Sequence, residues 1–380
     1  MDTEDLEQVL DAVRSFVRDE VVPREAEIEE TDAIPEVLRS GAAQMGLFGW
    51  AIPEEFGGLG LNAVEDAKLA FELGYTTPSF RSLVGTNNGI AGQVLVNYGT
   101  EEQKEYWLPR IASGEVIASF ALTEVDAGSD PSGMRTSARK VADGYVINGS
   151  KRFITNAGLA HVLIVFARTD PEATGTKGIS AFLVDKDAAG VTIGPHDKKM
   201  GQEGAWTSEL FFDNVEVGVD RLVGGAEEVG FRAAMASLAK GRLHIAAICV
   251  GQAQRILDES VAYAAQAKQG GREIGTFQLV QAMLADSYTE LLAARELVLG
   301  VAHRYDTGED RKLGPSAAKL FCSEMLGRVA DRGVQVHGGM GYMRSVPVER
   351  FYRAARLFRI YEGTSEVQRL VIARHLLASS

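Results

Sequence analysis

The chain has 380 residues, 46% of them hydrophobic, and 39 basic against 52 acidic side chains give it a formal net charge of -13. This length and composition exclude a disordered protein and allow more than one hydrophobic core. The acidic balance argues against nucleic acid, or an anionic membrane, as a partner bound through bulk charge. No apolar leader follows the acidic N-terminus and no segment resembles a membrane span, so we expect a soluble, cytoplasmic protein.

Helical periodicity dominates the first part of the chain. Apolar side chains recur on one helical face up to position 17, and Pro23 predicts a break soon afterwards. A glycine- and proline-rich connection follows. Further helices are expected at 63–73, around 91–98 and at 101–111.

Near residue 119 the pattern becomes that of strands. Asp143-Gly144 and Asn148-Gly149 predict hairpin turns on either side of strand-forming residues 145–147. Further strands are expected at 161–168, 179–185 and 209–217, where β-branched and aromatic residues concentrate. Several short strands separated by turns predict a small closed or nearly closed antiparallel sheet.

The helical period returns near residue 229 and continues almost to the end. Long helices are expected at 229–267, 276–306, 315–336 and 364–377, with a shorter one before the last. Cys249 and Cys322 fall inside these apolar patterns, which predicts buried thiols of a reducing compartment and no metal site. The order helix, strand, helix predicts an α+β multidomain chain, mainly α, with domains at 1–118, 119–226 and 227–380.

Glu362 is the first candidate catalytic residue. It stands before Gly363, Thr364 and Ser365 and a closing helix, for which Thr364 or Ser365 is the candidate N-cap. Residues 359–361 predict a mainly apolar setting, and removal from water makes a carboxylate a stronger base. The plainer interpretation is that Glu362 is a negative charge stabilised by the N-terminus of the following helix. Taken alone, the residues of this loop support the plainer interpretation over a catalytic base.

Three other segments carry residues suited to a ligand. Residues 120–130 combine hydroxyls with small residues, and 151–156 place Phe153 and Thr155 on one side of a strand, as a flat ring with polar edges requires. An ordinary loop and a half-buried strand explain them equally well. Arg242 is expected near a helix start, either as a solvated charge or beside a polar ligand. Residues 335–342 end a helix in glycines.

Together these segments resemble the acyl-CoA dehydrogenase family over essentially the whole chain. The motifs that carry the resemblance are residues 120–130, 148–156, 277–281, 335–342 and 361–364, in the family's order and spacing. The resemblance implies an N-terminal helical domain, a central β-barrel and a C-terminal four-helix bundle. It also implies a homotetramer or a heteromer.

The resemblance implies an FAD-dependent enzyme of fatty acid metabolism that oxidises an acyl-CoA to its trans-2-enoyl form. Glu362 matches the base that removes the α proton, while the β hydride goes to flavin N5. Some members carry the base at the position of Gly241, which has no carboxylate here. An electron-transferring flavoprotein is the implied electron acceptor. Acyl length, branching and an acyl-carrier protein in place of coenzyme A stay open.

The resemblance also carries site residues over to this chain. Flavin contacts are implied for Phe120, Leu122, Thr123, Gly128, Ser129, Phe153, Thr155 and Thr364, and for Gln335 and Gly339 toward a neighbouring subunit's nucleotide. Substrate contacts are implied for Ser129, Arg242, Tyr361 and Gly363.

The chain also departs from the family pattern. Val125 replaces a usual proline and Phe153 a usual tryptophan, and Glu366 replaces a frequent glutamine. Ala267 and Gly270 stand where an arginine and a phenylalanine commonly touch the partner's flavin, so weaker flavin retention is expected. Two alternatives follow: a structural subunit of a heteromeric complex, favoured by these two losses, and a flavin monooxygenase, disfavoured because such relatives do not need Glu362.

Overall fold

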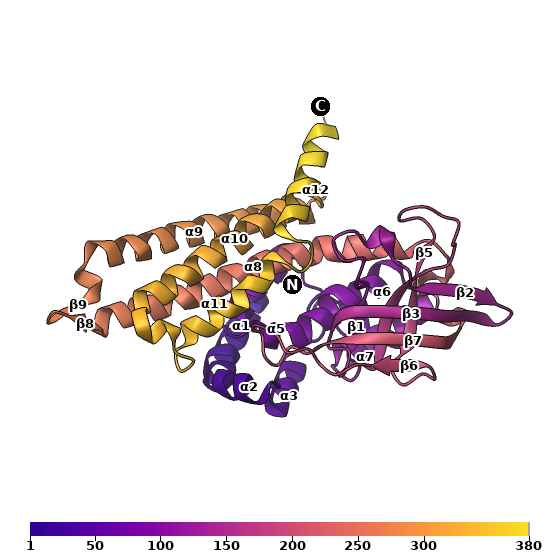
Figure 1. Cartoon of the computed structure of the whole chain (residues 1–380), viewed down its shortest axis with the longest axis horizontal. Coiled ribbons are helices and arrows are strands. Elements are labelled where there is room, and N and C mark those ends of the chain that lie inside the picture. The colour runs from indigo at the N-terminus through magenta and orange to yellow at the C-terminus, as the bar shows by residue number, and fades with distance from the viewer. Residues whose placement is uncertain (379–380) are drawn as a thin grey trace.

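The computed structural model describes residues 1–378, in which a helical N-terminal region and a helical C-terminal region pack together and a curled sheet lies beside them (Figure 1). The N-terminal helices are α1 (Thr3–Phe16), α2 (Glu25–Thr31), α3 (Glu36–Gln44), α4 (Ala63–Leu73), α5 (Pro78–Gly85), α6 (Gly92–Tyr98) and α7 (Glu101–Ala112). The three helices expected at 63–111 are therefore confirmed within two residues. The predicted break at Pro23 is confirmed by a 3₁₀ turn at Val22–Arg24, between α1 and α2.

The middle region is one mixed sheet. Its strands are β1 (Ala118–Ala121), β2 (Ser137–Val141), β3 (Gly144–Thr155), β4 (Val162–Arg168), β5 (Ile179–Asp185), β6 (Val191–Ile193) and β7 (Thr207–Gly218). They are ordered β1-β4-β2-β3-β7-β6, with β5 on the other edge of β4. The expectation of a purely antiparallel sheet is wrong, because β4 pairs in parallel with β1 and, at one position, with β2. Closure of this curled sheet into a barrel stays a prediction.

The two predicted hairpin turns have different outcomes. The predicted hairpin between β2 and β3 is confirmed, but Val141 pairs with Gly144, so the two turn residues are Ala142 and Asp143, one position earlier than the Asp-Gly signal placed them. Asn148-Gly149 is not a turn: it lies inside β3 at a register shift against β7. Gly149 has φ +144°, and a Cβ there would lie 2.6 Å from Thr136 Oγ1, so the glycine serves close strand packing.

The C-terminal region is built on three long helices that lie side by side in Figure 1. Its elements are α8 (Gly230–Gln266), the small strands β8 (Lys268–Gln269) and β9 (Arg272–Glu273), α9 (Gln278–Asp306), α10 (Leu313–His337), α11 (Pro347–Ala355) and α12 (Ser365–Ala378). The predicted helices are confirmed within two residues at each end. α12 packs mainly against α10 and then projects from the body, so a four-helix bundle stays a prediction.

One hydrophobic core joins the two helical regions, because it contains buried side chains of α4 and α5 together with those of α8 and α10. A second cluster fills the sheet, and a third lies where the sheet meets α6, α7 and the start of α8. Cys249 and Cys322 are buried free thiols in the first core, as expected. The division into the three predicted domains stays a prediction.

Helix α8 corrects one expectation. Among the described residues it alone is long and apolar enough to cross a membrane by length and composition. In its most apolar window 67% of the residues are buried, and its side chains occupy the shared core. The apolar character of this helix is therefore accounted for by packing within the chain.

Candidate active site

Glu362 lies in a tight loop between a 3₁₀ turn (Arg356–Arg359) and α12. Both Glu362 (φ +53°) and Gly363 (φ +92°) have left-handed backbone. The Glu362 side chain is 7% exposed. The Val367 N–H donates to Thr364 Oγ1 at 3.2 Å, so Thr364 is the N-cap of α12, one of the two residues predicted for that role.

The backbone of this loop is held by side chains from three helices. Lys319 Nζ on α10 donates to the Gly363 carbonyl at 2.7 Å. Gln368 Nε2 on α12 donates to the carbonyls of Glu362 and Gly363 at 3.1 and 3.0 Å. Arg242 Nε on α8 donates to the Glu362 carbonyl at 3.4 Å. The loop is therefore fixed from outside, which holds the carboxylate in one place.

The setting of the carboxylate is more polar than expected. Arg81 Nη2 lies 3.8 Å from Glu362 Oε1, and the Arg81 side chain is 3% exposed. Burial lowers the pKa of Lys319 to about 8, and it lowers that of Arg242 from its usual range. Burial also raises the pKa of Tyr361 well above its usual range. The expected mainly apolar setting was inferred from chain neighbours, and the cations come from helices distant in sequence.

The prediction that Arg242 starts a helix is wrong. Arg242 lies inside α8, more than three turns after the helix begins. Its neighbour Gly241 faces the candidate base: a Cβ at Gly241 would lie 2.6 Å from Glu362 Oε2. The position where some family members carry the base therefore lies against the Glu362 carboxylate. The missing side chain at 241 makes room for that carboxylate.

The residues implied for the flavin form a second group beside the sheet. Phe120 is in β1, Leu122, Thr123, Gly128 and Ser129 are in the loop that follows, and Phe153 and Thr155 are at the end of β3. Lys151 Nζ on β3 donates to the Leu122 carbonyl at 3.2 Å and to Glu124 Oε1 at 2.8 Å. The Arg152 N–H donates to the Thr123 carbonyl at 2.8 Å. These bonds bring the loop and the strand together.

This group fits a flat cofactor with polar edges. The hydroxyls of Thr123, Ser129 and Thr155 make no hydrogen bond within residues 1–378. Phe153 is 61% exposed, and a Cβ on Gly128 would meet only the Thr123 methyl, at 4.0 Å. Phe153 and Thr155 were predicted to lie on one side of the strand by strict alternation. Phe153 has φ +59° and lies at a register shift, so the alternation is broken there. The loop thus offers an exposed ring, hydroxyls and open space.

Helix α5 connects the two groups. Asn156 Nδ2, directly after β3, donates to the Ser82 carbonyl at 2.9 Å. Ser82 follows Arg81, whose guanidinium faces Glu362. The sequence analysis missed Arg81. The available signal was one charged residue in an otherwise uncharged helix that is buried throughout.

Gln335 and Gly339 are not part of this assembly within one chain. Gln335 is on α10, sixteen residues beyond Lys319, which places it about 24 Å along the helix from the Glu362 loop. Both residues are exposed. Any contact with a flavin would therefore be with that of another subunit, as the resemblance implies.

One of the two unusual positions after α8, Gly270, has a local explanation. Gln269 pairs with Arg272, so Gly270 and Gly271 form a two-residue hairpin turn, and both have positive φ (+59° and +80°). Such a turn favours glycine at both positions. The hairpin accounts for Gly270 where the family commonly has phenylalanine.

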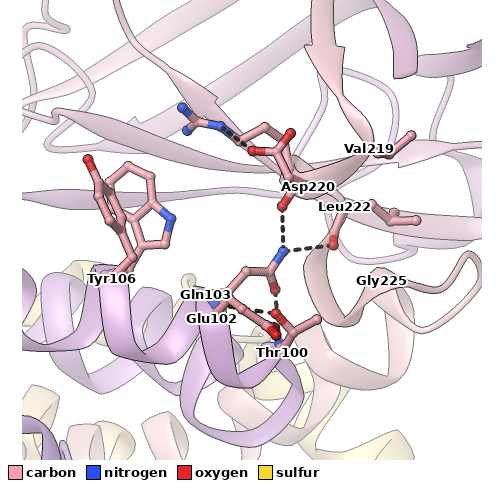
Figure 2. A pocket seen from close by; sticks show the side chains of 10 residues that line it. Thr100, Glu102, Gln103, Tyr106, Val219, Asp220, Leu222 and Gly225 are labelled. Carbon is pink, nitrogen blue, oxygen red and sulfur yellow. Dashed lines mark hydrogen bonds and ion pairs between the residues drawn. The ribbon is translucent and has the colours of Figure 1, made fainter. Parts of the chain in front are cut away.

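A surface pocket between α7 and residues 219–225 lies apart from all of these residues (Figure 2). Gln103 Nε2 donates to the carbonyls of Asp220 and Leu222, both at 2.8 Å, and its Oε1 accepts from the Gly224 N–H. The Gln103 amide is thus fully used in fastening α7 to the end of the sheet. None of the predicted site residues lines this pocket.

Three family models together match almost the whole chain: the acyl-CoA dehydrogenase N-terminal domain at residues 3–115, the middle domain at 119–215 and the C-terminal domain at 228–377. An acyl-CoA dehydrogenase of Bacillus subtilis is 40% identical over 368 residues, 97% of each chain.

Two solved structures extend this likeness to the fold. Butyryl-CoA dehydrogenase from Megasphaera elsdenii has a TM-score of 0.94 at 34% identity, covering 99% of this chain and 100% of that one. A glutaryl-CoA dehydrogenase from Mycobacterium smegmatis, in complex with FADH2, has a TM-score of 0.93 at 31% identity, covering 100% of this chain and 95% of that one. The chain therefore belongs to the acyl-CoA dehydrogenase family of FAD-dependent oxidoreductases, which act on the CH–CH bond of an acyl-CoA.

Proposed function

We propose that Glu362 is the base that removes the α proton of an acyl-CoA thioester during its oxidation to the trans-2-enoyl-CoA. The observation that carries the proposal is that Glu362 Oε2 is buried yet has no hydrogen-bond partner among the described residues. A carboxylate oxygen free of partners, on a loop held from outside, suits a group that must accept a proton. Gly241 supplies no competing carboxylate.

The loop also supplies a group for the thioester carbonyl. The backbone N–H of Glu362 makes no hydrogen bond within residues 1–378. A donor aimed at the carbonyl oxygen stabilises the charge that develops there as the α proton leaves, and thereby acidifies that proton. Arg242 and Lys319 act on the loop by fixing its carbonyls, and Tyr361 and Gly363 border the base.

The cofactor cradle is proposed to be the loop and strand beside it. Phe120, Leu122, Thr123, Gly128, Ser129, Phe153, Thr155 and Thr364 would hold FAD, while Gln335 and Gly339 would reach the FAD of a neighbouring subunit. When bound there, FAD supplies the acceptor, N5, for the β hydride. The residues of this chain bind and orient it, and they keep water from the carboxylate.

The test is the visible spectrum of the purified protein before and after anaerobic addition of saturated acyl-CoAs. A flavin spectrum that bleaches with a thioester is expected from wild type. Glu362→Gln is expected to keep the yellow colour and to bleach about 10³-fold more slowly, the typical contribution of a positioned base. Glu309→Gln, at an exposed position, is the matched control and should bleach at the wild-type rate. Bleaching by Glu362→Gln at the wild-type rate would show that another group is the base.

An electron-transferring flavoprotein is the proposed acceptor, and a cytoplasmic homotetramer is the proposed assembly. The homotetramer is supported by the exposure of Gln335 and Gly339, which lie far from the site of their own chain. The heteromeric alternative rests on Ala267 and Gly270, where the usual partner contacts are missing. Sizing the pure chain tests both: a yellow tetramer supports the first, and a colourless protein that turns yellow only with a second chain supports the alternative.

The substrate's acyl chain is left open by the relatives. Butyryl-CoA ends in a methyl group and glutaryl-CoA in a carboxylate, and the chain resembles enzymes named for each. The difference lies at the far end of the acyl group, beyond the carbons that react. Residues facing that end decide the choice.

A further inference from the structure

The loop between β6 and β7 (residues 194–206, the β6–β7 loop) contacts both parts of the candidate active site. On the side of the proposed flavin cradle, the Trp206 carbonyl accepts a hydrogen bond from the Asn156 N–H at 2.8 Å, directly after β3. On the side of the base, Gln202 Nε2 donates to the Ala354 carbonyl of α11 at 3.2 Å. The β6–β7 loop is therefore a second connection between the two groups of residues, besides α5.

Gln202 is the residue of this loop that lies deepest between the sheet and α11. Its side chain is buried with the rest of the residue, which is 3% exposed, and its backbone has φ +60°. That left-handed conformation is unfavourable for a residue with a side chain, so it persists only where the surrounding contacts hold it. A strained, buried, polar residue at the edge of a site is a candidate for a role in that site.

The second contact of the Gln202 amide is with the Tyr361 hydroxyl. Burial raises the pKa of Tyr361 well above its usual range, and the hydrogen bond with Gln202 acts in the opposite direction. The Tyr361 ring packs edge-on against Phe358, with the ring centroids 5.5 Å apart. Tyr361 is thus held at its ring by the 3₁₀ turn before it and at its hydroxyl by Gln202. Because Tyr361 directly precedes Glu362, this contact lies one residue from the proposed base.

The β6–β7 loop is itself fixed at two further places. The Gly204 N–H donates to Asp32 Oδ1, at the end of α2, at 2.7 Å. Arg353 Nη1 of α11 donates to the Met200 carbonyl at 3.0 Å and to Glu203 Oε1 at 2.9 Å. A loop fastened on both sides of its buried glutamine can hold a neighbouring side chain in one position instead of following its movement.

We propose that Gln202 is a positioning residue for the reaction: through the Tyr361 hydroxyl it sets where the Glu362 carboxylate lies relative to the flavin cradle. The inference rests on the proposed function, in which Glu362 takes the α proton while the β hydride leaves toward the flavin. The two transfers involve adjacent carbons of one substrate, so the base and the flavin must be held at a fixed separation. The β6–β7 loop is bonded to both sides and provides that separation. Gln202 acts through Tyr361 and takes no part in the proton transfer itself.

The test separates proton removal from oxidation. An acyl-CoA with sulfur in place of the β-methylene has no β hydride to lose, so the yellow protein can only remove and return its α protons. Exchange of the α positions in heavy water, followed by proton NMR, then measures the action of the base alone. Gln202→Met keeps the length of the side chain and should slow exchange by roughly 10- to 100-fold, because a displacement of about 1 Å has an effect of this size. Its calorimetric affinity for the same thioester should stay within about twofold of that of wild type.

Gln103→Met is the matched control. Gln103 is also a buried glutamine whose amide donates to backbone carbonyls, but it lies at the surface pocket of Figure 2, apart from the site. This variant should exchange at the wild-type rate even where its stability falls. Tyr361→Phe removes the other end of the contact and should slow exchange by a factor similar to that of Gln202→Met. If Gln202 acts through the phenol, the double variant should be no slower than the slower single variant.

A Gln202→Met variant that exchanges at the wild-type rate would overturn the inference. So would multiplied losses in the double variant, a fall in affinity that accounts for the slower exchange, or equal slowing by Gln103→Met. Should Gln202→Met fail to fold, Tyr361→Phe decides: exchange at the wild-type rate overturns the inference, and slower exchange with unchanged affinity supports it. A yellow wild type that binds the thioester without exchanging it would contradict the proposed function and the inference together. Exchange by wild type and Gln202→Met alike would contradict the inference alone.

Discussion

Two arginines, Arg350 and Arg81, are both buried, at 7% and 2% exposure, yet differ in their partners. Arg350 on α11 donates to Glu25 at 2.6 Å and to Glu29 at 3.3 Å. Arg81 has no hydrogen bond from Nε or Nη2 within residues 1–378. The first arginine joins parts of the fold through hydrogen bonds, whereas the second makes only a 3.8 Å ion pair with Glu362. The number of hydrogen-bond partners therefore distinguishes these two buried arginines more clearly than their burial does.

The structural cluster is centred on the Glu25 carboxylate of α2. Besides Arg350, it accepts hydrogen bonds from Thr76 Oγ1 at 2.7 Å and from the Thr77 N–H at 3.1 Å, and Arg255 of α8 lies 3.5 Å away. One carboxylate thereby connects α2, the segment before α5, α8 and α11. Removing one member leaves the opposite charge buried without its pair.

The largest expected stability effect is therefore that of Arg350→Met. It should reduce the free energy of unfolding by about 3–5 kcal/mol, because Glu25 and Glu29 lose a buried partner. Arg81→Met is the matched variant at a buried arginine that makes one ion pair of 3.8 Å and no hydrogen bond from Nε or Nη2, and it should reduce stability by less than Arg350→Met does. Urea unfolding of both variants measures the contrast. Equal losses in the two would show that the partners of Arg350 do not set it apart from Arg81.

Lys319 gives a smaller and pH-dependent effect in the site region. Burial lowers its pKa from 10.5 to about 8, so between these pH values the unfolded chain holds a proton that the folded chain lacks. Stability then rises with pH across this window. The free energy of unfolding of wild type, relative to Lys319→Met, should increase by roughly 3 kcal/mol from pH 8 to pH 10.5, at about 1.4 kcal/mol per pKa unit.

The control for Lys319 is Lys140→Gln, because the Lys140 side chain is 70% exposed. Its difference from wild type should stay constant over the same pH range. A constant difference for Lys319→Met as well would mean that this amine keeps its ordinary protonation in the folded protein. The neighbouring charges of Glu362 and Arg242 are the same in wild type and variant, so they cancel to first order.

Most of the fold followed from the sequence because its signals are local. The long helices α8, α9 and α10 repeat apolar residues over many turns, and the adjacent Asp143 and Gly144 mark the β2–β3 hairpin to within one residue. Asn148-Gly149 carries the same local signal, but the close approach of Thr136, the residue before β2, decides its conformation. The parallel pairing of β1 with β4 joins residues more than forty positions apart, which no local pattern encodes.

The site was predictable only where it is contiguous. The Glu362 loop and the Thr364 cap are adjacent in sequence, and both were found. Arg81 reaches Glu362 from 281 positions away, and only packing makes them neighbours. The polar setting of the carboxylate was missed for the same reason.

The smallest expected effect compares the caps of two helices. Thr364 caps α12 and Thr100 caps α7, each through its hydroxyl and an N–H three residues on, at 3.2 Å in both. Replacement by alanine should cost about 1 kcal/mol at either helix. α7 buries Trp107 and Leu108, so its loss should appear in global unfolding. α12 has Leu370 54% and Leu376 57% exposed, so its loss should appear as local opening.

Amide hydrogen exchange separates the two results. Thr364→Ala should speed exchange in the first turns of α12 and leave the urea midpoint nearly unchanged, whereas Thr100→Ala should lower the midpoint. A lowered midpoint for Thr364→Ala would mean that α12 unfolds together with the core. The opening matters at the site, because Gln368 on α12 holds the carbonyls of Glu362 and Gly363. Fraying at Thr364 should therefore loosen the loop that positions the base.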